Sequence, residues 1–115
     1  MEKVKLTGLD GHVFGYAEIL LKFKVYGEKF AVHEYPQLQN GQLSFWNGIY
    51  SATHIETGLN GADFCDSIDE ARREVLNKAQ KVGPVEFKEI LERDRQKIKK
   101  LTAIETEVNQ KHHQQ

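Results

Sequence analysis

The sequence predicts a single α+β domain, with an antiparallel β-sheet of four to five strands followed by two C-terminal α-helices packed on one face. Three observations predict this fold: apolar residues alternate in the first half, they recur at helical spacing from residue 67 onward, and 115 residues suffice for one core. We expect the domain to span residues 1–108, with strands at about 3–59, helices at about 67–82 and 84–108, and a polar flexible tail at 109–115.

The segment from His12 to Tyr26 alternates apolar and other residues with strict period two. Such regularity indicates one long, half-buried strand, which could split at Gly15. A turn at Tyr26-Gly27 then leads into a second strand, and the two form a hairpin. Because proline cannot donate to a β-ladder, Pro36 is expected to end that second strand.

Three Asn-Gly dipeptides follow, at residues 40–41, 47–48 and 60–61. Asn-Gly suits the positive φ angles of a two-residue hairpin turn. The second lies between Ser44-Phe45-Trp46 and Ile49-Tyr50-Ser51, which predicts a hairpin centred on residues 47–48.

Helix signals begin after residue 66. Ser67 and Glu70 have the spacing of a capping box, while Gly83 and Pro84 suit the end of one helix and the start of the next. From Pro84 to Val108 the second helix would be about 37 Å long, at 1.5 Å per residue. That length reaches the edge of a domain of this size, so we expect self-association through the second helix, giving a homo-oligomer.

Composition limits the other classes of protein. The formal net charge of −1 does not by itself favour nucleic acid, and a single cysteine, Cys65, excludes an intrachain disulfide. The apolar run from Tyr16 to Val25 is too short and too charged to span a bilayer, and the N-terminus lacks the apolar run of a signal peptide. A cytoplasmic protein without membrane contact is expected.

Two arrangements could carry chemistry. Cys65 precedes the predicted helix that begins at Ser67, and a helix N-terminus lowers a thiol pKa; His33 or His54 would then be the base. Alternatively, His12, His33 and His54 could converge on a metal with Glu34, Glu56 or Asp63. No nucleophile motif or short metal-ligand spacing accompanies these residues, so we predict no enzyme, no cofactor and no metal site.

The candidate ligand- or partner-binding residues come from two features. Basic side chains crowd one stretch of the second helix, where they could meet phosphate or form a solvated face after the acidic first turns. Several aromatic residues in the strands fall opposite the predicted core face, where they would mark a binding surface or pack in a second small core. The selected residues are Trp46, Tyr50, His54, Arg93, Arg95, Lys97 and Lys100.

The segment from Ile49 to Ala79 runs from a strand through Thr53-His54-Ile55-Glu56-Thr57-Gly58 into a capped amphipathic helix. In size and layout it resembles short accessory proteins of phages and mobile elements. The resemblance covers the middle third of the chain, and no functional residues are carried over from it. It implies a protein that binds and modulates a host factor.

Taken together, these features predict a non-enzymatic binding protein that acts through protein–protein contact, with a host protein as its partner. One alternative is a small-ligand protein that binds or sequesters a nucleotide signal or another small anion at a subunit interface. A second alternative is nucleic-acid binding through the basic second helix, with an affinity that falls steeply as salt increases.

Overall fold

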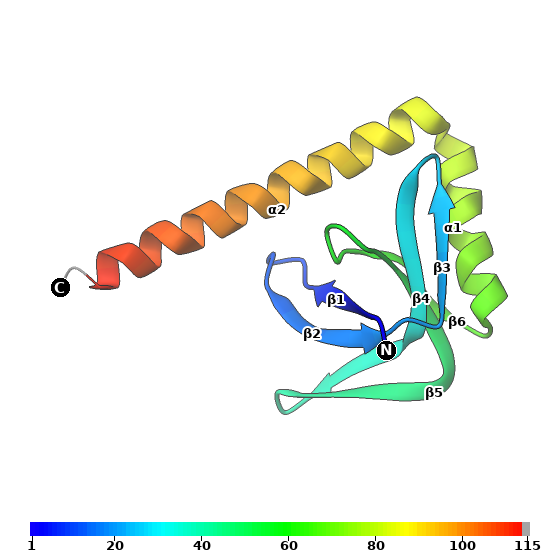
Figure 1. The fold of residues 1–115 in the computed structure, drawn as a ribbon, viewed down its shortest axis with the longest axis horizontal. Helices are drawn as coiled ribbons and strands as arrows, with labels where there is room; N and C mark the ends of the chain where they lie inside the picture. The colour runs from blue at the N-terminus through cyan, green and yellow to red at the C-terminus, as the bar shows by residue number, and fades with distance from the viewer. Residues whose placement is uncertain (114–115) are drawn as a thin grey trace.

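The computed structural model describes the backbone of residues 1–113 and the side chains of residues 1–103. It shows antiparallel sheets followed by two C-terminal helices, so the predicted α+β class is confirmed (Figure 1). The elements are β1 (Lys3–Thr7), β2 (Val13–Glu18), β3 (Leu21–Val25), β4 (Glu28–Gln39), β5 (Gln42–His54), β6 (Asn60–Cys65), α1 (Ile68–Val82) and α2 (Pro84–His113).

The strands form two sheets instead of one. β1 and β2 make a two-stranded sheet, and the other four make an antiparallel meander in the order β3-β4-β5-β6. The predicted long strand from His12 to Tyr26 is therefore wrong, and its break lies after β2 and not at Gly15. The N–H of Ile19 donates to Glu2 and the N–H of Leu20 donates to Val32, so consecutive residues bind different sheets.

Only some of the predicted turn signals lie at turns between strands. Tyr26-Gly27 and Asn40-Gly41 connect neighbouring strands as predicted, and all four residues have positive φ. Asn47-Gly48 does not form the predicted hairpin, because it lies inside β5, where the pairing with β4 shifts between Glu34 and Tyr35. The third dipeptide, at residues 60–61, begins β6, a strand that the sequence analysis did not include.

Pro36 does not end β4, contrary to prediction. β3 pairs with β4 only as far as Val32, so the residues beyond have β5 as their one partner in the four-stranded sheet, and Pro36 pairs with Phe45. A strand with one free edge accepts a proline because the missing N–H can fall on the unpaired side.

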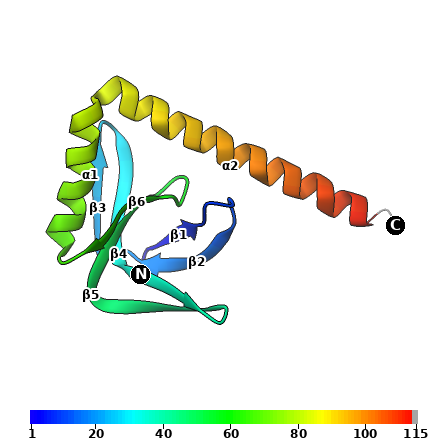
Figure 2. The same ribbon diagram turned by 180° about the vertical axis from the view of Figure 1, so that it is seen from behind.

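The larger sheet carries a core on each face. On one face α1 packs over Phe30, Val32 and Ala52 through its buried residues Val75 and Ala79. On the other face the β1–β2 hairpin covers the sheet, and its core consists of Val4, Leu6, Ala17 and Ala31. Helix and hairpin therefore lie on opposite sides of the four-stranded sheet (Figure 2).

The first helix begins and ends where the sequence predicts. The N–H of Glu70 donates to the Ser67 hydroxyl at 3.0 Å, and a Glu70 carboxylate oxygen accepts the N–H of Asp66 at 2.9 Å. At the other end Gly83, with φ of 86°, donates its N–H to Ala79. A positive φ at this position lets the chain leave α1 and start α2 at once.

The second helix leaves the body of the domain (Figure 1). Its first turns pack into the α1-side core through Phe87 and Leu91, and farther along Leu101 lies against Gly11 in the β1–β2 loop. The apolar residues Ile104 and Val108 near the end of this helix lie outside the described side chains, so self-association through the helix stays a prediction. Among the described helices, none combines the length and the apolar character needed to cross a membrane.

One glycine is required where the hairpin meets the sheet. Gly58 has φ of 77°, and a Cβ on it would lie 2.2 Å from the Thr7 hydroxyl oxygen. Gly41 has nearly the same φ, 78°, but no atom within 4 Å of its Cβ position. We expect Gly41→Ala to cost about 1 kcal/mol of unfolding free energy from backbone strain alone, and Gly58→Ala at least about 2 kcal/mol more.

Chemical denaturation of both variants measures this difference. Equal losses at the two positions would show that the contact between Gly58 and Thr7 does not restrict the chain.

Candidate functional site

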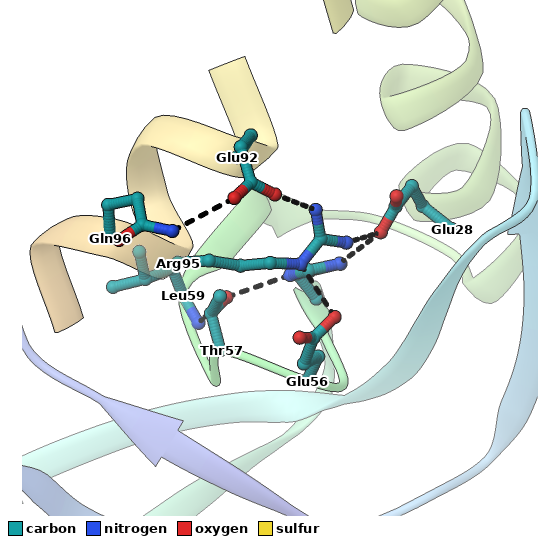
Figure 3. A network of polar contacts seen from close by, with 8 residues as sticks. Glu28, Glu56, Thr57, Leu59, Glu92, Arg95 and Gln96 are labelled. Carbon is teal, nitrogen blue, oxygen red and sulfur yellow. Dashed lines mark hydrogen bonds and ion pairs between the residues drawn. The ribbon is translucent and has the colours of Figure 1, made fainter. Parts of the chain in front are cut away.

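A polar network joins α2 to the sheet (Figure 3). Arg95 projects from α2 and donates to Glu56 at 2.7 Å, to Glu92 of its own helix at 3.2 Å, and to Glu28. These partners, Glu56 first among them, raise the pKa of the guanidinium above its ordinary value. The Arg95 side chain is only 23% exposed, so it is partly buried where it links α2 to the sheet.

His54 extends the network into the interior. Its Nε2–H donates to Glu28 at 3.0 Å, and its Nδ1 is 2.8 Å from the Thr57 hydroxyl. The N–H of Leu59 donates to the same hydroxyl at 3.2 Å. Because a carboxylate can only accept, the Glu28 contact places a proton on Nε2, and the Nδ1–Thr57 contact joins the other ring nitrogen to the turn that follows β5.

A carboxylate, an imidazole and a hydroxyl in series are also the parts of a nucleophilic triad. Thr57 is 3% exposed, however, and its oxygen already accepts the N–H of Leu59. A substrate carbonyl would have to reach this hydroxyl, and the surrounding chain covers it. The arrangement therefore orients the turn at the end of β5 and does not present a nucleophile.

The network also contains the donor atoms of a metal site. Ligand atoms of Glu28, His54 and Glu56 lie within 4.8 Å of one another, and no other such group occurs in the described part of the chain. The Arg95 guanidinium donates to both glutamates and already supplies a positive charge there. The other two histidines of the predicted convergence, His12 and His33, contact different partners.

His33 is buried in β4 with both ring nitrogens engaged. Its Nδ1–H donates to the Glu34 carbonyl at 2.8 Å, and its Nε2 accepts the Thr53 hydroxyl at 2.7 Å. Burial lowers the pKa of His33, because the charged form loses water. The side chain is thus a neutral, satisfied part of the sheet.

Cys65 is a buried, protonated thiol. Its Sγ donates to Glu74 at 2.9 Å, and burial together with the charges of Glu74, Glu70 and Asp63 raises its pKa to about 12. The expected field of the α1 N-terminus is therefore outweighed by desolvation and by nearby carboxylates. A thiol of this kind is a poor nucleophile at neutral pH.

Three aromatic side chains form an exposed cluster, named here the aromatic surface: Tyr35, Trp46 and Phe64. Their ring centroids are 5.1 to 5.7 Å apart, and each pair is inclined by 59° or more. Trp46 also donates its indole N–H to Gln37. Trp46 remains 40% exposed and Phe64 57% exposed, so the rings contact one another while facing solvent.

The backbone of Phe64 is strained. Its φ is 56°, a region in which a bulky residue loses about 1–2 kcal/mol. The pairing of β5 with β6 shifts between Tyr50 and Ala52, which leaves an extra residue in β6 and turns Phe64 toward Tyr35 and Trp46. Strained residues of this kind concentrate at functional sites.

A cleft of about 410 Å³ lies between α2 and the strands, named here the α2 cleft. Residues from the β1–β2 hairpin, β4, β6 and α2 line it, and Tyr35 belongs to both the cleft and the aromatic surface. Its lining includes Thr7, Leu9, Phe14, Tyr35, Leu59, Asn60, Asp63, Asp94, Lys97 and Ile98.

The seven candidate residues from the sequence do not converge. Trp46 lies in the aromatic surface, Tyr50 packs against the α1-side core, and His54 and Arg95 belong to the polar network. Lys97 lines the α2 cleft, whereas Arg93 and Lys100 are exposed on α2.

No pattern in the sequence points to Phe64 or Glu28, whereas Arg95 was among the predicted binding residues and Glu56 among the possible metal ligands. Phe64 was not singled out, because β6 was not predicted and only the bulge makes this residue face the other two rings. Glu28, Glu56 and Arg95 are far apart in sequence, and no local pattern links them. The basic stretch of the sequence alone did not indicate that three carboxylates surround Arg95.

Comparison with known protein families, curated proteins and solved structures gives no match. The fold and site define a small α+β domain with a four-stranded antiparallel sheet between a β-hairpin and a helix. An aromatic surface and an adjoining cleft distinguish its exterior.

The network predicts that Arg95 contributes to stability far more than its exposed neighbour Arg93. Arg95→Ala leaves Glu28 partly buried without its cation, so we expect a loss of about 1–3 kcal/mol in unfolding free energy. Arg93→Ala should cost about 0.5 kcal/mol or less. Denaturant titration of the two variants makes the comparison, and similar losses would refute the structural role of Arg95.

The state of His33 predicts a pH dependence. Its folded pKa lies below the unfolded value of about 6.5, so its full contribution to stability is present above that pH. As pH falls below about 6.5, the unfolded chain binds the proton first, and this contribution declines by at most about 1.4 kcal/mol per pH unit. Unfolding free energies at pH 7 and pH 5 should therefore differ less in His33→Gln than in the wild type.

The matched control is His12→Gln, since the His12 side chain is 59% exposed. An unchanged pH slope in His33→Gln would contradict the assignment.

Proposed function

We propose that this chain is a non-enzymatic binding protein that acts through protein–protein contact. The observation that carries the proposal is the aromatic surface formed by Tyr35, Trp46 and Phe64. Aromatic side chains dominate the energetics of protein interfaces, above all where they cluster. A surface of this kind that is partly exposed in the single chain supports a role in recognition.

The strain at Phe64 strengthens the argument. A bulky residue with φ of 56° carries about 1–2 kcal/mol of backbone strain, and strained residues cluster at functional sites. The exposure of Phe64 and its contacts with Tyr35 and Trp46 favour a role in binding.

The alternatives from the sequence have less support. Arg95 is engaged by three carboxylates and is not free to meet a phosphate, which weakens nucleic-acid binding through the basic stretch. The buried thiol of Cys65 and the covered hydroxyl of Thr57 weaken the enzymatic reading. A host protein, the partner implied by the resemblance to phage accessory proteins, is the partner we propose.

Phe64→Gly separates binding from folding. Glycine adopts positive φ without strain, so this variant should stay within about 1 kcal/mol of the wild-type unfolding free energy while losing the ring. Trp46→Ala removes a second member of the surface. We expect either change to weaken partner binding about 10-fold or more, as for an interface hot spot.

The measurement is chemical cross-linking in cells that express the tagged chain, followed by quantitative mass spectrometry of the captured proteins. Val85→Ala is the matched control, because Val85 is 72% exposed at the start of α2 and lies outside the aromatic surface. A partner captured equally by the wild type, Phe64→Gly and Trp46→Ala would refute the proposed surface.

A further inference from the structure

The α2 cleft has the size and lining of a small-molecule site. Its volume of about 410 Å³ falls within the range in which proteins bind small ligands. Phe14 and Ile98 contribute partly covered apolar surface to its walls, Leu9 lies at its edge with 89% of its surface exposed, and a few polar groups accompany them. One turn beyond Ile98, Leu101 lies against Gly11, so helix and hairpin loop meet there and keep the two walls of the cleft together.

The charges in the cleft are unbalanced. Asp94 is half-buried on α2, and its side chain has no hydrogen bond or ion pair with any other described residue. Asp63 accepts the Ser51 hydroxyl at 2.6 Å through one carboxylate oxygen. Lys97 is the one basic side chain in the lining, and it is exposed. Two carboxylates therefore face one ammonium group, which leaves an excess of negative charge.

The aromatic residues that line the cleft also favour a positively charged ligand. Phe14 and Tyr35 line the cleft, and the faces of aromatic rings attract cations. A carboxylate without a protein partner can accept a charge-assisted hydrogen bond from a cationic ligand, and such a bond is stronger than one between neutral groups. An anionic ligand would instead meet Asp63 and Asp94, so the small anion expected from the sequence does not suit this cleft.

We propose that the α2 cleft binds a small organic cation, a primary amine attached to an apolar body. The ammonium group donates to Asp94, with Asp63 contributing to the negative field, and the apolar body packs against Leu9 and Phe14. The cleft shares Tyr35 with the aromatic surface, but its ligand is a small molecule and the proposal does not rest on the protein contact proposed above.

Phenethylamine and phenylacetate provide a matched pair of probes, because they share an apolar body and carry opposite charges. Titration of the isotope-labelled full chain, followed by NMR, should give saturable shifts at cleft residues with phenethylamine. For a ligand of about nine heavy atoms we expect a Kd of about 1 mM. Phenylacetate should give no saturable shifts at these residues.

Two substitutions assign the binding to the cleft. Asp94→Asn keeps the shape and removes the charge, so phenethylamine binding should weaken about 10-fold or more. Lys97→Met removes the competing ammonium and should strengthen binding several-fold. Glu89→Gln is the control, because Glu89 is an exposed carboxylate of α2 outside the cleft lining, and it should leave the Kd unchanged.

The spectrum of each free variant shows whether it is folded before the probe is added. Absence of saturable binding to the wild type would overturn the proposal. So would equal binding of phenylacetate, or an unchanged Kd in folded Asp94→Asn. Asp94→Asn leaves the three rings of the aromatic surface unchanged and should capture the protein partner like the wild type, so that failure of the cleft and failure of the aromatic surface are distinguished.

Discussion

Burial of β4 on both faces is the constraint on which the rest of the structure depends. Its adjacent residues Ala31 and Val32 are each fully buried, yet they belong to two different cores, one under the β1–β2 hairpin and one under α1. Successive side chains of a strand point to opposite faces, so the hairpin must be present to bury Ala31 and α1 to bury Val32. The crossover at Ile19 and Leu20 meets this requirement by carrying the chain from one sheet to the other.

The position of α2 follows from the same layers. Phe87 and Leu91 anchor its first turns in the α1-side core, Arg95 ties its middle to Glu28 and Glu56, and Leu101 rests on the hairpin loop. These three kinds of contact fix the position of α2 relative to the strands. The space that remains between the helix and the strands is the α2 cleft. Since Asp94 lies between the apolar anchor and Arg95, the fold itself places an unpaired carboxylate in that space.

The aromatic surface has a different origin. Tyr35 follows the shift in the β4–β5 pairing, and Phe64 follows a shift in the β5–β6 pairing. Bulges turn side chains away from the regular alternation and are common next to functional sites. Two irregularities in neighbouring ladders thus bring three rings together, and one of these rings belongs to a residue with a positive φ, Phe64.

Local patterns in the sequence determined the α+β class, both helix starts and the turns at Tyr26-Gly27 and Asn40-Gly41, because caps, periodicity and positive φ depend on residues close together in the chain. They did not distinguish Asn40-Gly41 from Asn47-Gly48, since the same dipeptide serves a hairpin turn or a bulge according to the strand beside it. Nor did they reveal that Arg95 faces Glu28, 67 residues away. Pairing register, the division into two sheets and the charge of the cleft were decided only by tertiary contacts, because each depends on groups that meet after folding.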